Sequence, residues 1–566
     1  MQNPVTKRQN PTRLCNESWP AVALRPGPPK SLLRIVRFWL SLPPMGDSAS
    51  VSHDMPPERH SARSQSASLF RLHAGDVQVY RLCDDCTGAL IFTMLVFSPW
   101  AFGTTQPWSV KVMNASGYAL GFLLLVKLFL RWTKGHSPPR WNESSQASGS
   151  GRHVTSGMTM MLAITSVLLL VFTLISAVNA RSTYHPWQTS FEYHAYIEWL
   201  PHSFDRQRSW FAFWQQLGLG CTFWAVWDWL LGKTESELRA APGRTCDQET
   251  MTWPLPARLR YLLWILCVNG ALLAVEGIIQ RLEGSGKLLF IIQPRVNPQA
   301  EAQFGPYAYR ANASQYFNML WPVCLGFWWI LHRTRGLTIR RHHWLLPCAA
   351  IMAACPAISS SRGGVLISAG LAMVVILVLG VGGLFSKSRD SGKPWARKVA
   401  VGALAMFLVV ATGLGVALGW SALQPRMRHL SEGFDQREEM YELARPMATD
   451  YPTFGTGPGT FEPVFQLYRA STETYWPAQL HNDWLETRIT YGWCGCALFG
   501  LALGCVFLRW FAPGGIFAGR RFALLIALGL AGCLAHARFD FPFQIHSLVF
   551  LFLTLSAILF CLTRRP

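Results

Sequence analysis

The 566-residue sequence contains few charged residues. Only 14% of its residues are Asp, Glu, Lys or Arg, whereas 50% are hydrophobic. Soluble domains usually carry about 25% charged residues, so this composition argues against a soluble protein and indicates a polytopic membrane protein. The formal net charge is +20. Because the basic residues mostly lie between apolar runs, where they orient a chain in the bilayer, we do not expect nucleic-acid binding.

The sequence also lacks the patterns of a disulfide framework, a metal site or a nucleotide site. Its 14 cysteines are scattered, and Cys83 and Cys86 form a CxxC pair without the second pair that a zinc site needs. The segment GTGPGT, residues 455–460, lacks the GK[ST] ending of a phosphate loop. We interpret it as a glycine-rich turn, and we expect no metal and no cofactor.

Apolar runs are abundant, and a membrane-spanning helix needs about 20 apolar residues. Chains in lipid must satisfy their own backbone hydrogen bonds, so these runs predict helices rather than open sheets. We expect an all-α, polytopic integral membrane protein with about twelve spans. The candidate spans are 87–103, 112–131, 157–179, 210–231, 260–280, 315–331, 344–360, 364–384, 399–419, 489–510, 521–537 and 545–562.

Basic residues predict the orientation of these spans. Short loops rich in Lys and Arg stay in the cytoplasm, and such loops alternate consistently along the chain if both termini are cytoplasmic. The basic residues on this face are Lys134, Arg140, Arg152, Lys233, Arg239, Arg244, Arg333, Arg335, Arg340, Arg341, Lys387, Arg389, Lys393, Arg397, Lys398, Arg520, Arg521, Arg564 and Arg565. Basic residues on the opposite, outer face therefore need another explanation.

The predicted domain organisation follows from these spans. Residues 1–85 are rich in Pro, Ser and Arg and are expected to form a disordered, basic cytoplasmic tail. Residues 86–419 would hold the first nine spans, and 489–566 the last three. Between them, 420–488 form a large outer loop that has apolar residues at helical spacing, so we expect a partly helical subdomain.

Two arginines lie at the outer ends of predicted spans. Arg362 opens SRGG, and its guanidinium could bind a phosphate or could reach lipid headgroups. Arg310 precedes Asn312 and Gln315 at the start of another span. These three side chains could bind an anion or a sugar, or Asn312 could cap the helix.

Polar residues also gather before the tenth span. Asp483 with Glu486 resembles a capping box, which leaves His481 and Asn482 unexplained. A histidine at this edge could act as a general base, because its pKa lies near neutrality, or it could have no catalytic role. Arg538 and Asp540, in the last outer loop, could pair with each other or could orient His481 or Arg362.

Together these motifs resemble the O-antigen ligase and O-antigen polymerase superfamily of bacterial membrane glycosyltransferases. The resemblance covers roughly residues 87–562. It rests on GPYAYRANASQYF, SRGG, GTGPGTF and HNDWLETRITYGWCG, the last of which carries His481, Asn482, Gly492 and Gly495 in the ligase-type order.

The resemblance implies a function at the periplasmic face of the bacterial inner membrane. Such enzymes transfer a glycan from an undecaprenyl-diphosphate carrier to an acceptor hydroxyl on a lipid or a glycan, usually without metal. Arg362 and Arg310 would bind the diphosphate, and His481 would activate the acceptor. Asn482 and Asp483 would orient the acceptor or bind the sugar.

Two alternatives remain from the sequence. Within the superfamily, the chain could be a repeat-unit polymerase instead of a ligase. In another class, it could be a twelve-helix secondary transporter, although such proteins often show related halves and midplane sites. Here no half-repeat is obvious, and the polar residues gather at one rim.

Overall fold

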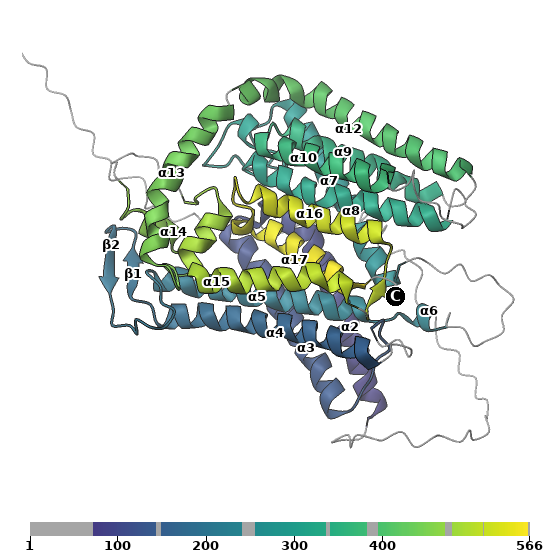
Figure 1. The fold of residues 1–566 in the computed structure, drawn as a ribbon, viewed down its shortest axis with the longest axis horizontal. Coiled ribbons are helices and arrows are strands. Elements are labelled where there is room, and N and C mark those ends of the chain that lie inside the picture. Colours follow the sequence, from purple (N-terminus) through teal and green to yellow (C-terminus); the bar gives the residue numbers. More distant parts are fainter. Residues whose placement is uncertain are drawn as a thin grey trace, which may run out of the picture. The chain divides into compact units, whose positions relative to one another are not determined.

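The computed structural model describes residues 72–142, 149–239, 255–335, 340–381, 394–428, 430–469, 478–512 and 514–563, and most of these residues are helical (Figure 1). The longer helices are α2 (Ala74–Trp100), α3 (Pro107–Thr133), α4 (Gly149–Val178), α5 (Arg206–Leu231), α7 (Ala257–Glu283), α8 (Arg310–Arg335), α9 (Leu345–Ile358), α10 (Arg362–Val375), α12 (Pro394–Arg428), α13 (Leu430–Asp450), α15 (Asp483–Leu508), α16 (Arg520–His536) and α17 (His546–Cys561).

The shorter elements connect these helices. They are η1 (Phe102–Thr104), α6 (Glu235–Arg239), η2 (Ala300–Ala302), η3 (Arg340–Trp344), the π-helical turn η4 (Ile376–Val381), α14 (Phe461–Phe465), η5 (Arg509–Phe511) and η6 (Pro542–Gln544). Strands β1 (Ser182–His185) and β2 (Ser190–Tyr193) form an antiparallel hairpin, with Ser182 opposite Tyr193. The two-residue strands β3 (Ile516–Phe517) and β4 (Leu562–Thr563) pair in parallel.

Each of the twelve predicted spans overlaps a helix in the part of the chain that the structure describes. Of the described helices, 7 are long and apolar enough to cross a membrane. They are α2, α3, residues 157–178 of α4, α7, α10 with η4, α12, and α15 with η5. Helices α9, α16 and α17, with 14, 17 and 16 residues, are shorter than a typical span of about 20 residues. The chain is thus a mostly helical, multi-pass protein, and the count of twelve spans stays a prediction.

The N-terminal tail was predicted to extend to residue 85, which is too far along the chain. Helix α2 begins at Ala74, because the backbone N–H of His73 donates to the Asp76 carboxylate at 3.0 Å and fixes the first turn. Residues 74–85 are therefore helical rather than disordered. The rest of the predicted tail, up to residue 71, lies outside the described residues.

Charged side chains buried between α2, α3, α5 and α7 are paired. Lys127 on α3 is completely buried and lies 2.9 Å from Asp228 of α5 and 3.1 Å from Asp84 of α2. Arg131 and Arg140 reach the same Asp228 carboxylate at 2.6 and 2.8 Å. Arg258 of α7 also pairs with Asp84, at 2.5 Å. An unpaired buried charge would cost several kcal/mol, so these ion pairs fix how the four helices meet.

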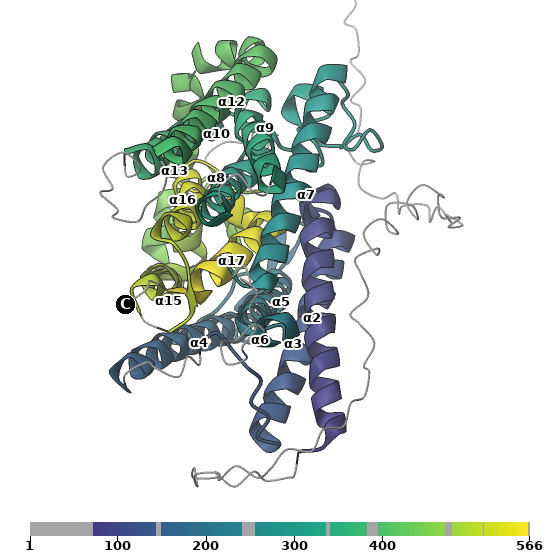
Figure 2. The ribbon, with the colours of Figure 1, turned by 90° about the vertical axis from the view of Figure 1, so that its right-hand side faces the viewer.

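Helix α8 is the most buried long helix and packs against α7, α9, α10 and α16 (Figures 1 and 2). Its Trp321 and Trp328 are each at most 1% exposed. Gly529 of α16 allows close approach, since a Cβ there would lie 2.6 Å from the carbonyl oxygen of Met319. Small residues commonly bring membrane helices together in this way.

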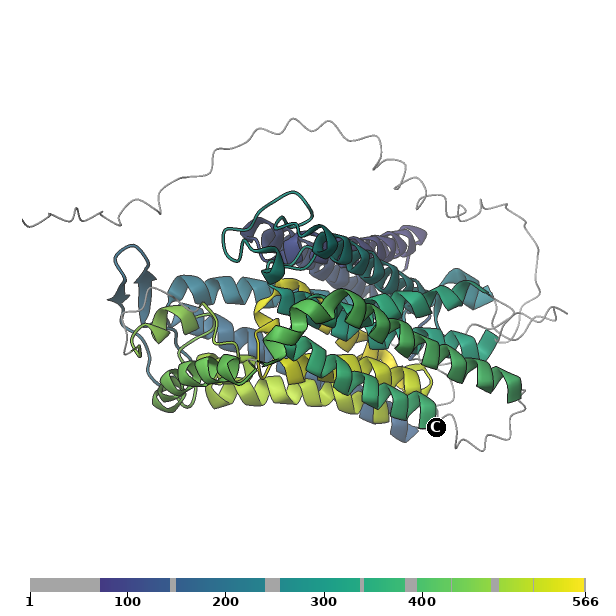
Figure 3. The same cartoon turned by 90° about the horizontal axis from the view of Figure 1, so that it is seen from above.

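The predicted outer loop contains helices α13 and α14, which pack beside the β1–β2 hairpin (Figures 1 and 3). Tyr441, Met447 and Phe461 are buried there, together with Phe204, which follows the hairpin. The expected start of this segment at residue 420 is too early, because α12 continues to Arg428. The partly helical character agrees with the spacing of apolar residues in the sequence.

The glycine-rich turn at 455–460 docks onto a break in α15. Gly492 has φ 63° and interrupts the helix. Beside this break, the N–H groups of Thr456 and Gly457 donate to the carbonyls of Ile489 and Thr490 at 2.8 and 3.0 Å. A Cβ on Gly492 would lie 2.3 Å from the carbonyl oxygen of Thr453. The two glycine motifs therefore form one structural joint.

The second glycine of SRGG brings α10 against α8. A Cβ on Gly364 would lie 1.7 Å from Ser314 Oγ, and Asn318 donates to the Gly364 carbonyl at 2.9 Å. Gly364→Ala should therefore destabilise the protein by about 1–3 kcal/mol through overpacking. Thermal unfolding of purified protein would measure this loss.

Gly370→Ala is the matched control on the same helix, because no atom lies within 4 Å of a Cβ there. This control should unfold at or slightly above the wild-type temperature, since alanine favours helix. Equal unfolding temperatures for the two variants would contradict the packing account.

Candidate functional site

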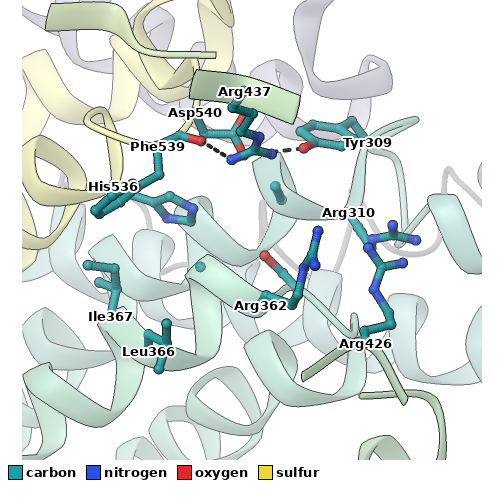
Figure 4. Close-up of a pocket in the computed structure, with 13 residues that line it drawn as sticks. Tyr309, Arg310, Arg362, Leu366, Ile367, Arg426, Arg437, His536, Phe539 and Asp540 are labelled. Atoms are coloured by element: carbon teal, nitrogen blue, oxygen red, sulfur yellow. Dashed lines mark hydrogen bonds between the residues drawn. The ribbon is translucent and has the colours of Figure 1, made fainter. Parts of the chain in front are cut away.

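One pocket opens where the ends of α8, α10, α12 and α16 meet α13 (Figure 4). Its lining residues are Tyr309, Arg310, Ala311, Ser361, Arg362, Gly363, Leu366, Ile367, Arg426, Arg437, His536, Phe539 and Asp540. Four of them are arginines, and Asp540 is the only carboxylate among these described lining residues. The pocket therefore carries an excess of positive charge.

Each arginine comes from a different helix. Arg310 and Arg362 are the first residues of α8 and α10, while Arg426 lies near the end of α12 and Arg437 lies on α13. Ser361 caps α10, since its hydroxyl accepts a hydrogen bond from the N–H of Gly364 at 3.2 Å. Helix starts also carry partial positive charge, so the placement of Arg310 and Arg362 adds to the attraction for anions.

The arginines repel one another. Burial, then the positive charge of Arg426 and, less strongly, the charges of Arg281 and Arg362 together lower the pKa of Arg310 to about 10, although Tyr309 acts in the opposite direction. Its Nη1 donates to the carbonyl oxygen of Glu301 at 2.6 Å, a neutral acceptor. Arg310 still carries its charge near neutral pH, and a bound anion would relieve the repulsion.

Next to the arginines, His481 contacts Asp540. The distance from His481 Nδ1 to Asp540 Oδ1 is 3.2 Å, and Asp540 is 3% exposed. Burial raises the pKa of Asp540, but the hydrogen bond and charge of His481, with His536 and Arg437, outweigh burial and hold this pKa below its usual range. Asp540 therefore stays ionised and can orient the imidazole.

Two aromatic rings frame this pair. Tyr309 stacks on Phe541 with ring centroids 5.5 Å apart, and the His481 ring meets Phe541 edge-on at 4.7 Å. Burial and the Asp540 charge raise the pKa of Tyr309, so its hydroxyl keeps its proton and donates to Asp540 Oδ2 at 3.4 Å. Both carboxylate oxygens of Asp540 thus have partners.

The backbone at His481 is unusual for a residue other than glycine. Its φ is 57°, in the left-handed region, which costs about 1–3 kcal/mol. Tyr441 holds this conformation by donating its hydroxyl to the carbonyl oxygen of His481 at 2.7 Å. Such local strain often accompanies functional residues.

The helix-capping prediction for this stretch is wrong by one residue. Asn482, not Asp483, caps α15, because its side chain accepts from the N–H of Leu485 at 3.2 Å. Glu486 accepts from the N–H of Leu480 at 2.9 Å, and Asp483 accepts from the N–H of Phe543 at 2.7 Å. These three polar residues therefore build the local fold and place His481.

Of the predicted site residues, all within the described chain, only Arg310, Arg362 and Asp540 line the pocket; His481 lies behind Asp540, and the remaining ones lie elsewhere. Asn312 and Gln315 are 3% and 1% exposed, and both lie inside α8, so Asn312 is not its cap. Arg538 is exposed, with its guanidinium 5.9 Å from the ring centroid of Tyr441. The alternative in which Arg538 pairs with Asp540 is replaced by the contact between Asp540 and His481.

The pocket also contains residues that sequence reasoning missed. Arg426 and Arg437 lie in a segment that was expected to be outer loop, where basic residues do not orient the chain. Their positive charge on the expected outer face could therefore have marked them as candidate site residues in the sequence. His536 ends α16, inside a predicted span, and its Nε2 would lie 3.1 Å from a Cβ on Gly363. No sequence pattern linked it to Arg362.

The fold and pocket together define a multi-pass, helical membrane protein with an anion-attracting site at one end of its helices. Residues 347–500 match the family model described as O-antigen ligase, and this match supports assigning the chain to the O-antigen ligase and polymerase superfamily. The matched segment contains Arg362, Arg426, Arg437 and His481. A comparison with curated proteins found no match.

The match suggests an enzyme of the O-antigen ligase or polymerase type, and the helices that are long and apolar enough to cross a membrane fit a multi-pass membrane protein. Arg310, His536 and Asp540 lie outside the matched segment. They reach the pocket only through the fold.

Asp540→Asn should lower the unfolding temperature at neutral pH. Because the folded-state pKa of Asp540 lies below the usual 3.8, the ionised carboxylate stabilises the fold above that value. This stabilisation is lost as the pH falls through the folded-state pKa.

The difference in unfolding temperature between wild type and Asp540→Asn should therefore shrink below about pH 4. Thermal unfolding of both proteins, from about pH 7 to about pH 3, would measure it. A difference that stays constant over this range would contradict the assignment.

Proposed function

We propose that this protein transfers a glycan from an undecaprenyl-diphosphate carrier to an acceptor hydroxyl at the periplasmic face of the bacterial inner membrane. In this proposal both termini are cytoplasmic, and the reaction is ligase-like. The supporting observation is the pocket with four arginines beside the contact between Asp540 and His481.

The arginines suit the leaving group of this reaction. When the bond between sugar and diphosphate breaks, negative charge grows on the departing diphosphate, and positive charges already in place stabilise that charge. Guanidinium groups bind phosphate oxygens in pairs of hydrogen bonds. Arg362 and Arg426 would hold the diphosphate together with Arg310.

The location of the pocket suits a lipid-linked donor. Leu366 and Ile367 of α10 line the same pocket, and Leu366 is 48% exposed. Apolar side chains thus continue from the arginines along a helix that is apolar enough to span the membrane. The polyprenyl chain would stay in lipid while the diphosphate reaches the arginines.

His481 would act as the general base. If Nδ1–H donates to Asp540, the lone pair of Nε2 is available to take the proton of the acceptor hydroxyl. The hydroxyl oxygen then attacks the anomeric carbon from the face opposite the diphosphate, and the configuration inverts. The diphosphate leaves with the electron pair of the broken bond, and no metal is required.

His536 is a second candidate for the base, since it lines the pocket itself. His481→Ala should reduce transfer about 100- to 10,000-fold, the usual contribution of a general base. The measurement is transfer of a lipid-linked glycan by membranes that contain equal amounts of each variant.

His185→Ala is the control, because the His185 side chain at the end of β1 is 41% exposed and pairs with Glu192. It should retain wild-type activity. Full activity of His481→Ala combined with loss in His536→Ala would move the role of base to His536.

The surface glycans of a deletion strain would test the reaction type. Loss of attached polymer with accumulation of long lipid-linked chains is expected for a ligase. Accumulation of single repeat units would assign the polymerase alternative. Unchanged glycans with altered solute uptake would favour the transporter.

The same strain, complemented with variants, would test the arginines. Arg362→Gln should lower transfer about 100- to 1,000-fold, as loss of one charge-stabilising donor does. Arg445→Gln should restore wild-type glycans, since Arg445 is an exposed residue of α13 paired with Glu438. Normal glycans with Arg362→Gln would refute the proposed diphosphate site.

A further inference from the structure

Three histidines come together at the end of α8 that lies away from the arginine pocket. His332 belongs to the last turns of α8, and His342 and His343 belong to η3. One nitrogen from each of the three imidazoles lies within 4.8 Å of the others. From the rise of an α-helix, His332 lies roughly 33 Å along α8 from Arg310.

The trio is enclosed on several sides. His332 and His342 are 6% and 3% exposed, and His343 is half-buried. Trp328 stacks on His332 with centroids 5.2 Å apart, and the rings of His342 and His343 lie 4.1 Å apart. The stacking of Trp328 on His332 and the close approach of His342 and His343 hold the imidazoles in a small space.

Three imidazoles in such a space form a metal-binding arrangement. Imidazole nitrogen suits zinc, copper, nickel and iron, whereas calcium and magnesium prefer oxygen ligands. Zn²⁺ binds nitrogen at about 2.0–2.1 Å, so two ligating nitrogens would lie about 3.3 Å apart. The three nitrogens lie within 4.8 Å of one another, and small rotations of the side chains would bring them to the distance that Zn²⁺ requires.

From this geometry we propose that His332, His342 and His343 bind one divalent transition-metal ion, with Zn²⁺ as the best fit. The ion would tie the end of α8 to η3 and α9. It would take its fourth ligand from solvent, because His343 is partly exposed. This site does not belong to the transfer reaction, which lies at the opposite end of α8.

The expectation of no metal came from the outer segments and from the lone CxxC pair. The histidine trio has no recognisable motif spacing, because His332 and the adjacent pair belong to different elements. Only the folded chain brings the three rings together.

The test uses full-length protein in detergent, stripped with a chelator and then dialysed against Zn²⁺. Elemental analysis should find about one zinc per chain, the stoichiometry of a single three-histidine site. Zn²⁺ should also raise the unfolding temperature, since binding to the folded state alone stabilises it. Co²⁺ in place of Zn²⁺ should give the visible absorption of a tetrahedral site.

Two variants and a control complete the test. His342→Ala and His343→Ala should each weaken Zn²⁺ binding by at least about tenfold. His343 is more exposed than His342, so His343→Ala disturbs the packing less. His136→Ala should bind as wild type, because His136 packs alone against Tyr80. Absence of bound zinc in the wild type, or unchanged affinity in His343→Ala, would overturn the proposal.

Discussion

Repulsion between arginines held close together is the interaction on which the functional site depends. Arg310 is shielded from solvent and lies near the positive charges of Arg426, Arg281 and Arg362, so its own charge is destabilised by this arrangement. The surrounding fold must hold these groups in place against that repulsion. An anion with two phosphates would remove the repulsion, which gives the pocket a physical preference for such a ligand.

The rest of the fold supplies the rigidity that this arrangement needs. Helix α8 is buried over most of residues 311–332, and Gly364 and Gly529 let α10 and α16 approach it closely. The hydrogen bonds between the glycine-rich turn and the residues just before Gly492 hold the first turns of α15 in place. Asn482, Asp483 and Glu486 then place His481 against Asp540. Motifs that look like binding sequences thus serve mainly to position His481 and Asp540.

The helices were predictable, because long apolar runs allow few other structures in lipid. The orientation of the spans also singled out Arg310, Arg362 and His481 as candidate site residues, because charge or polarity at the outer rim had no topological explanation. Sequence reasoning also foresaw that Asp540 could orient His481. However, it could not decide whether Asn482 and Asp483 cap a helix or bind the substrate, because the same polar side chains can serve either role.

Residues from distant segments were beyond the sequence alone. Arg426, Arg437 and His536 enter the pocket only because α12, α13 and α16 end beside α8 and α10. Likewise, the packing that places Ser314 against Gly364 and His332 beside His342 depends on which helices are neighbours. The periodicity and composition of the sequence do not predict which helices are neighbours.

The central claim is that the arginine pocket binds a polyprenyl diphosphate. The most direct measurement compares the affinity of purified protein for undecaprenyl diphosphate and for undecaprenyl monophosphate, together with the variant Arg426→Gln. The account predicts tighter binding of the diphosphate, a preference that weakens with rising salt and that Arg426→Gln removes. Equal affinity for the two lipids, or an unchanged preference in Arg426→Gln, would contradict it.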